Sequence, residues 1–347
     1  MPWTKVLVEK QEAILDEHHG EGQRILGYAD SIREAFLQAL DNDPNVYIMG
    51  QGVDDPTGMF GTTLGLHQQF GRKRVFDTPL SENALMGMAV GSAITGMRPI
   101  YMHNRPDFLL LTMDQIVNHA SKWRYMFGGH GQVPLVIWAV IGRGWGSGAQ
   151  HSQALQGFFM HIPGLRLVMP STAYDAKGLL LESIADDNPV IILEHRWLLK
   201  RRGYVPKEMY RIPFGKGIVR RTGSHVTIAG VSQMIVEAQQ AAEELAKAGI
   251  EAEVLDFRTL KPLDKELLFH SLAKTGRLVL VDNGWKTAGI TAEICALIVE
   301  EGLDLLRAPV KRVTCPDIPT PAGYTLEAAF YPGQKQIQEA VQQLMNL

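Results

Sequence analysis

Residues 78–83 of the chain, Thr78-Pro79-Leu80-Ser81-Glu82-Asn83, follow a short β-type run, Arg74-Val75-Phe76, and precede an apolar segment rich in Gly and Ala that extends to Gly96. A segment that is apolar on nearly every face predicts a helix inside a domain, where small residues let other backbones approach. The junction therefore places one carboxylate, Glu82, at the rim of a dry core. Locally, the commoner role would be an N-terminal cap, because Ser81 and Glu82 both favour a helix N-terminus.

The composition is typical of a soluble globular protein: 347 residues, 46% apolar and 20% charged, with a net charge of −3. This length predicts two domains. The charge balance does not favour nucleic acid or an anionic membrane as a partner, and the apolar runs are too short to span a bilayer. Residues 1–26 resemble no targeting segment and are expected to form a partly ordered arm. Cys295 and Cys315 are expected to be buried thiols in a reducing compartment, which predicts a cytoplasmic protein.

From residue 29 onward, β-rich runs alternate with helical segments, a pattern typical of a doubly wound parallel α/β sheet. The first domain is expected over residues 27–200, with its first helix capped by Asp30 and Ser31 and further helices at 107–125 and 174–183. Its expected strands cover residues 46–49, 99–102, 135–141, 166–169 and 190–193. Residues 135–141 are apolar at every position, as expected of a central strand covered on both faces.

A polar stretch at residues 201–220 is expected to link the first domain to a smaller α/β domain at residues 221–347. In the second domain, strands are expected at residues 225–229, 252–257, 278–281 and 310–314. The expected helices are 232–248, which carries an apolar stripe, and 333–347.

Five motifs occur in an order and spacing that together are more specific than any one of them. They are Asp77-Thr-Pro-Leu-Ser-Glu82, Gly96-Met-Arg-Pro-Ile100, Asp114-Gln-Ile-Val-Asn118, Gln150-His151-Ser152-Gln153 and Pro170-Ser-Thr-Ala-Tyr-Asp-Ala-Lys-Gly178. The set resembles the beta subunits of thiamine-diphosphate-dependent 2-oxoacid dehydrogenases, the decarboxylating component of the pyruvate, branched-chain and acetoin complexes. The resemblance extends from Gly27 to the C-terminus. It implies an oxidoreductase with a pyrimidine-binding α/β domain and a transketolase C-terminal-like domain.

The resemblance also implies roles for individual residues. Glu82 would bond to N1′ of the aminopyrimidine of thiamine diphosphate, with Gln51, Leu80 and Arg105 completing the cofactor-binding set. His151 would contact the substrate and assist transfer to a lipoyl group, a task that suits an imidazole because its pKa lies near working pH. The Gly-rich loop before it, residues 142–148, has neither the spacing of a dinucleotide-binding fingerprint nor the Lys-Ser/Thr end of a P-loop.

Residues 183–189 taken alone predict only the end of a helix, with Asn188 and Pro189 as stop signals. In the family that the chain resembles, this turn holds a monovalent cation through backbone carbonyls and Asp and Asn side chains. The implied K⁺ ligands are Leu135, Ser183, Asp186 and Asn188.

The chain contains no Gly-Asp-Gly sequence. Thiamine-diphosphate enzymes use a Gly-Asp-Gly…Asn segment to bind Mg²⁺ and the diphosphate. The resemblance therefore implies that an alpha subunit holds Mg²⁺ and shares the cofactor, that the chain is active only with that subunit, and that two alpha and two beta subunits form a heterotetramer. A lipoyl acyltransferase core is a further implied partner.

Two departures from the family pattern lie close to the implied chemistry. Arg105 stands where an aromatic residue usually packs against the pyrimidine, and Gly50-Gln51-Gly52-Val53 replaces the usual Gly-Glu-Asp-Val. Both changes favour an anionic substrate over a pyruvate-like one. The main hypothesis is a beta subunit that supports decarboxylation and acyl transfer. A split transketolase-like enzyme, which moves a two-carbon unit to a sugar or aldehyde, and a non-catalytic scaffold on the same fold remain alternatives.

Overall fold

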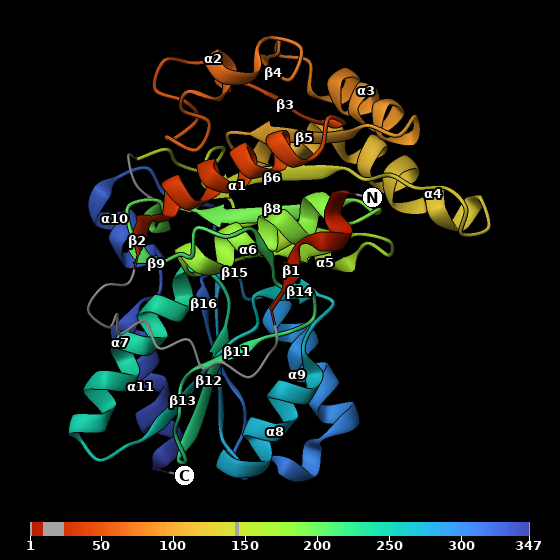
Figure 1. Cartoon of the computed structure of the whole chain (residues 1–347). Coiled ribbons are helices and arrows are strands. Elements are labelled where there is room, and N and C mark those ends of the chain that lie inside the picture. Colours follow the sequence, from red (N-terminus) through yellow and green to blue (C-terminus); the bar gives the residue numbers. More distant parts are fainter. Residues whose placement is uncertain (1, 10–23, 143–145, 347) are drawn as a thin grey trace. The chain divides into compact units, whose positions relative to one another are not determined.

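The computed structural model describes residues 2–9, 24–142 and 146–346 (Figure 1). Contacts within the chain divide it into two compact units. In the described part, unit 1 contains residues 2–9, 24–141 and 158–214, and unit 2 contains residues 142, 146–157 and 215–346. In this part of the chain no helix combines the length and apolar character needed to cross a membrane.

Unit 1 is built on a parallel sheet in which neighbouring strands follow the order β7-β8-β6-β5-β3-β4. The strands are β3 (Val46–Gly50), β4 (Val75–Asp77), β5 (Arg98–His103), β6 (Val136–Ile141), β7 (Arg166–Val168) and β8 (Val190–His195). All six residues of β6 are buried, because strands on both sides and helices above and below exclude water from it. The predicted doubly wound α/β fold is confirmed.

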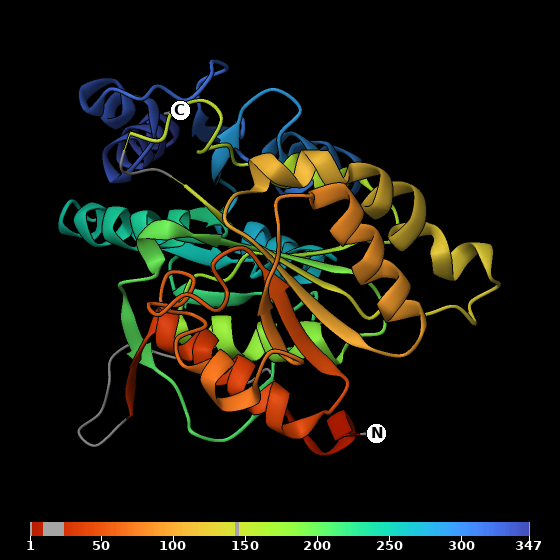
Figure 2. The same ribbon diagram turned by 90° about the horizontal axis from the view of Figure 1, so that it is seen from above.

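Helices cover both faces of this sheet. α1 (Tyr28–Asn42) and α6 (Ala173–Ala185) pack side by side on one face, and α3 (Glu82–Ile94) lies on the other side, as Figures 1 and 2 show. The prediction that Asp30 and Ser31 cap α1 is wrong. The helix begins at Tyr28 with Gly27 as its N-cap, and the Ser31 hydroxyl donates to the Tyr28 carbonyl inside the first turn, at 2.7 Å.

Residues 107–125, predicted as one long helix, follow a helical path that changes its geometry twice. A 3₁₀ segment (Pro106–Thr112) leads into a π-helical segment (Asp114–Ala120) and then into α4 (Ser121–Met126). Pro106 starts the path because its fixed φ suits the first turn of a helix. The first two segments pack against α3.

The polar segment after β8 is tied to unit 1 by a buried ammonium group. Lys177 in α6 donates to a Glu34 carboxylate oxygen at 2.7 Å and to the carbonyls of Pro206 and Glu208 at 2.8 and 2.9 Å. A buried charge is stable only with such partners, so Lys177 fixes this part of the connector on α6. Short strands also anchor unit 1: β1 (Leu7–Val8) pairs with β10 (Tyr210–Arg211), and β2 (Ile25–Gly27) pairs with β9 (Arg202–Tyr204).

Unit 2 has a second sheet with the order β11-β13-β12-β15-β16. Its strands are β11 (Ile218–Arg221), β12 (Val226–Gly230), β13 (Ala252–Asp256), β15 (Leu278–Trp285) and β16 (Lys311–Cys315), and only β11 runs antiparallel to its neighbour. The apolar stripe predicted on the first helix is buried: α7 (Gln233–Lys247) packs on the sheet beside α11 (Gln334–Met345). The other helices are α8 (Lys265–Thr275), α9 (Ile290–Glu301) and α10 (Tyr324–Phe330).

The end of β8 in unit 1 carries a fully buried carboxyl group, Glu194. It accepts a hydrogen bond from the Tyr28 hydroxyl at the start of α1. Burial raises the pKa of Glu194 to about 8, although the Tyr28 hydrogen bond lowers it. The folded chain therefore holds Glu194 protonated at neutral pH, where the unfolded chain ionises it.

We expect Glu194→Gln to stabilise the chain at pH 8 and to lose this advantage as the pH falls toward 4.5. Between an ordinary pKa of 4.5 and the folded value of about 8, only unfolded chains release the proton, so rising pH favours unfolding of the wild type. Glutamine cannot ionise, and its carbonyl can still accept from Tyr28. Thermal unfolding midpoints measured from pH 4.5 to 8.5 test this. Glu300→Gln, an exposed site in α9, is the control for charge loss. A difference in unfolding midpoint between the wild type and Glu194→Gln that is the same at every pH would contradict this expectation.

Candidate functional site

Glu82 is the first residue of α3 and follows β4 by a short turn. Ser81 occupies the N-cap position, but its side chain makes no capping hydrogen bond. The Glu82 side chain is only partly buried, whereas Leu85, Met86 and Ala89 on the same helix are buried. The carboxylate thus lies at the open end of an apolar helix, as the sequence predicted.

The strand register brings the residues around Glu82 to one edge of the sheet. Gly50 is paired with Asp77 on one side and with Met102 on the other, so these three residues form a row across β4, β3 and β5. Thr78 and His103 belong to the next row, at the carboxyl ends of β4 and β5. Open α/β sheets bind their ligands at this edge, which makes it the candidate site.

Gly50 allows the strands to approach at this edge. Its φ is +151°, and a Cβ atom there would lie 2.3 Å from the Met102 carbonyl oxygen. No other residue would fit without moving the backbone. The Thr78 amide donates to the Gly50 carbonyl at 3.1 Å, and the Asp77 carboxylate accepts from the Gly52 amide. The turns after β3 and β4 are therefore held together beside Glu82.

The charge of Glu82 acts on Tyr101, a buried residue of β5. Burial raises the pKa of the Tyr101 hydroxyl, and the negative charge of Glu82 raises it further. Tyr101 is therefore a neutral hydroxyl.

Among the buried polar atoms at this edge that have no hydrogen-bond partner in the described part of the chain are Thr78 Oγ1 and His103 Nε2. Burial lowers the pKa of His103 to about 3, so its imidazole is neutral, and its ring lies 4.1 Å from the Tyr101 ring. Unsatisfied buried polar atoms are rare and point to a ligand. With Glu82 they fit an aminopyrimidine, a ring whose edge both donates and accepts hydrogen bonds. The sequence predictions missed both residues, although His103 is a polar residue at the end of the buried strand β5 and Thr78 directly follows β4.

The other members of the predicted cofactor set lie at this edge with different exposures. Gln51 is half-buried and Leu80 is 78% exposed. Arg105, two residues beyond β5, is buried, with its guanidinium 5.6 Å from the centroid of the Phe60 ring. Burial lowers the pKa of Arg105, and the charge of Asp107 partly opposes this effect.

His151 belongs to unit 2, whereas Glu82 belongs to unit 1. The imidazole is exposed, and the His151 amide donates to the Gly148 carbonyl at 3.4 Å. Part of the Gly-rich loop before it, residues 143–145, lies outside the described residues. The joint action of Glu82 and His151 stays a prediction.

The predicted K⁺ ligands lie at the opposite edge of the sheet, because they precede β6 and β8. The Asp186 Oδ1 accepts from the amide and side-chain nitrogens of Asn188, both at 2.7 Å, and its Oδ2 lies 2.9 Å from Arg166 Nε. The Ser183 hydroxyl donates to the Leu179 carbonyl, and the Leu135 carbonyl accepts from the Val190 amide. A cation here would therefore rely on backbone carbonyls. Among residues of defined position, no group of three or more His, Cys, Asp or Glu side chains is arranged to hold a metal ion.

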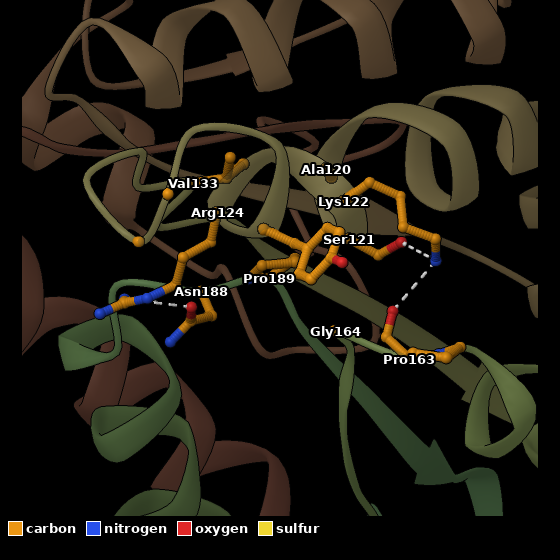
Figure 3. A pocket seen from close by; sticks show the side chains of 12 residues that line it. Ala120, Ser121, Lys122, Arg124, Val133, Pro163, Gly164, Asn188 and Pro189 are labelled. Atoms are coloured by element: carbon orange, nitrogen blue, oxygen red, sulfur yellow. Dashed lines mark hydrogen bonds between the residues drawn. The ribbon is translucent and has the colours of Figure 1, made fainter.

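A cavity of about 850 Å³ lies at this same edge, between α4 and the turns that precede β6, β7 and β8 (Figure 3). Lys122 bonds to the Pro163 carbonyl at 3.2 Å, and Arg124 bonds to the Asn188 side chain at 3.3 Å. The cavity is thus separated from Glu82 by the length of the strands.

Comparisons with known proteins agree with this geometry. Residues 26–201 match the transketolase pyrimidine binding domain, and residues 215–337 match the transketolase C-terminal domain. A solved structure of a split gene transketolase, an inactive beta4 tetramer, superposes with a TM-score of 0.75 at 22% identity, covering 93% of this chain and 99% of that one. This similarity shows the shared fold.

Curated relatives cover nearly the whole chain. The acetoin:2,6-dichlorophenolindophenol oxidoreductase subunit beta of Bacillus subtilis (strain 168) is 42% identical over 93% of this chain and 98% of its own length. The pyruvate dehydrogenase E1 component subunit beta of Gracilaria tenuistipitata var. liui is 43% identical over 91% and 98%. The 2-oxoisovalerate dehydrogenase subunit beta of Bacillus subtilis (strain 168) is 39% identical over 92% and 98%. With Glu82 at the ligand edge of a transketolase-type pyrimidine domain, the chain belongs to the family of E1 beta subunits of the thiamine-diphosphate-dependent 2-oxoacid dehydrogenases.

Proposed function

We propose that the chain, together with an alpha subunit, catalyses the decarboxylation of a 2-oxoacid and the transfer of the acyl group, and that Glu82 activates the cofactor. The observation that carries this proposal is the position of the Glu82 carboxylate in the first turn of α3, shortly after the carboxyl end of β4. Thiamine diphosphate, when bound, supplies the electron sink for breaking the bond next to a carbonyl group.

The residues of the chain would position that cofactor and move its protons. Glu82 would hold a proton at N1′ of the pyrimidine and take it back, a role that needs an ionisable group within hydrogen-bond reach. Thr78 and His103 would bond to the polar edge of the ring, since Thr78 Oγ1 and His103 Nε2 are buried and have no hydrogen-bond partner among the described residues. Gly50 would keep the strand ends close enough to support it. We also assign to His151 a proton transfer at the substrate or the acyl acceptor.

The proposal includes a site shared with an alpha subunit. Leu80 is 78% exposed before α3 and Met88 is 66% exposed on it, and large apolar side chains beside a functional edge favour a partner that covers them. The relatives are named as beta subunits, and the chain lacks a Gly-Asp-Gly segment for Mg²⁺. We therefore propose an alpha subunit that holds Mg²⁺ and a heterotetramer of two alpha and two beta subunits, in the cytoplasm. A K⁺ ion at the turn before β8 and a lipoyl acyltransferase core belong to the same proposal.

A split transketolase-like activity is the second candidate, and Arg105 is the observation that favours it. A buried cation at the ligand edge suits an anionic sugar substrate as well as an anionic 2-oxoacid. The two activities differ in their acceptor: the first releases CO₂ and reduces an artificial electron acceptor, whereas the second forms a longer sugar from an aldehyde. Assays of both products with the assembled complex distinguish them.

We expect Glu82→Gln to lower kcat by about 10²–10⁴-fold or more, because an amide cannot take up the N1′ proton. The measurement is turnover by the complex of this chain and its alpha subunit. Loss of a favourable charge at the helix N-terminus should cost only about 0.3–1 kcal/mol of stability, so the fold should persist. Glu82→Asp, which keeps the acid but shortens its reach, should retain more activity than Glu82→Gln. A Glu82→Gln complex with more than about a tenth of the wild-type rate would show that Glu82 serves only α3.

We expect the isolated chain to bind thiamine diphosphate and Mg²⁺ weakly or not at all, because the diphosphate end of the cofactor would have no metal site. Calorimetry with the isolated chain and with the assembled complex measures this. The complex should bind the cofactor tightly in a Mg²⁺-dependent manner. Equally tight Mg²⁺-dependent binding by the isolated chain would refute the shared site.

A further inference from the structure

Arg105 is a buried cation that uses few of its hydrogen-bond donors. Its side chain is only 8% exposed. Nη1 donates to the Asn104 carbonyl at 2.6 Å, while Nε is buried without a partner in the described part of the chain. A guanidinium carries five N–H donors in a planar fork, and in the described part of the chain the only hydrogen bond of this fork goes to the Asn104 carbonyl.

The surroundings compensate the charge only in part. The Phe60 ring, 5.6 Å away, offers a cation–π contact, which supplies no oxygen acceptor. Asp107 is also buried and its charge favours the protonated guanidinium, but burial has the larger effect on the pKa of Arg105. Removing a charge from water is costly unless hydrogen bonds replace the lost hydration.

Arg98, at the opposite end of the same strand, shows how this chain satisfies an arginine that serves the fold. Its guanidinium donates to the Asp187 carboxylate at 2.6 Å and to the carbonyls of Ile184 and Asp186 at 3.0 Å, and it lies 3.6 Å from Asp43. Among the residues that the structure describes, Arg105 has no comparable set of partners. The two arginines thus differ in their hydrogen-bond partners and in their position, because Arg98 lies at the amino edge of the sheet and Arg105 lies at the ligand edge.

We propose that Arg105 binds an anionic group of the substrate, a carboxylate or a phosphate, that persists through the reaction. The inference rests on the proposed function and names the substrate class of that site. The carboxylate next to the reacting carbonyl is a poor candidate, because it loses its charge as CO₂ leaves and a clamp on it would stabilise the substrate more than the transition state. The bound anion is therefore a second one, and the planar fork of arginine suits either chemistry.

Two matched pairs of substrates test the proposal with the complex of this chain and its alpha subunit, loaded with thiamine diphosphate and Mg²⁺. The first pair is 2-oxopentanoate and 2-oxoglutarate, and the second is hydroxypyruvate and phosphohydroxypyruvate. We expect kcat/KM to favour the substrate that carries the second anionic group in one pair by at least about tenfold, as a charge-assisted bidentate bond provides. The first pair reports a carboxylate and the second a phosphate.

Arg105→Phe should abolish that preference, and Arg105→Lys should lose most of it, because an ammonium cannot form the bidentate pair. Arg105→Lys keeps the charge and decides the matter if the Phe variant does not fold. Arg72→Gln, an exposed arginine, controls for charge loss and should keep the wild-type preference. A wild type without preference in either pair, or an Arg105→Phe complex that keeps it, overturns the proposal.

Binding of unreactive anions separates this inference from the proposed function. If the complex turns over none of the four compounds, calorimetry with glutarate and with propyl phosphate decides. Binding that Arg105→Lys weakens at least tenfold supports the anion site even though the proposed decarboxylation fails. Absent binding, or binding that the substitution does not change, overturns the anion site. If turnover depends on Glu82 but not on Arg105, the proposed function is supported and the anion site is refuted.

Discussion

The close approach of β3 to β5 at Gly50 is the constraint on which the candidate site depends. A Cβ atom at Gly50 would lie 2.3 Å from the Met102 carbonyl oxygen, so the two strands can meet only with glycine at this position. The approach fixes the register in which Asp77, Gly50 and Met102 share a row. Thr78 and His103 are carried to the same edge by that register, and the turn after β4 delivers Glu82 beside them.

Three buried ionisable groups of unit 1 offset the cost of burying a charge in different ways. Lys177 keeps its charge by bonding to Glu34 and to backbone carbonyls, so its burial stabilises the connector. Glu194 gives up its charge, because burial raises its pKa to about 8. Arg105 cannot lose its proton at ordinary pH, and within the described residues it donates to one carbonyl, that of Asn104. The first two groups are stabilised within the fold, whereas Arg105 is the group for which we propose a ligand.

Much of the fold was predictable from the sequence because burial on both faces leaves a local signal. Residues 135–141 are apolar without interruption, and β6 is buried throughout. The cap of α1 was not predictable from Asp30 and Ser31, since the pairing of β2 with β9 starts the helix directly after Gly27. The change from 3₁₀ to π geometry after Pro106 likewise leaves no mark in the apolar pattern.

The part of the candidate site that depends on one residue was predictable from the sequence. The part that several strands form together was not. Glu82 was visible as an acid between a strand and an apolar helix. His103 was not, because a polar residue at a strand end becomes informative only once the register shows which edge it reaches and which atoms lack partners. Arg105 falls between the two cases. The sequence shows a cation in place of an aromatic residue, and the structure adds that Phe60 lies beside it and that its Nε is buried without a partner in the described chain. An aromatic residue at this position would need only packing, whereas a buried guanidinium needs an anion, so the exchange changes what the ligand edge requires of its substrate.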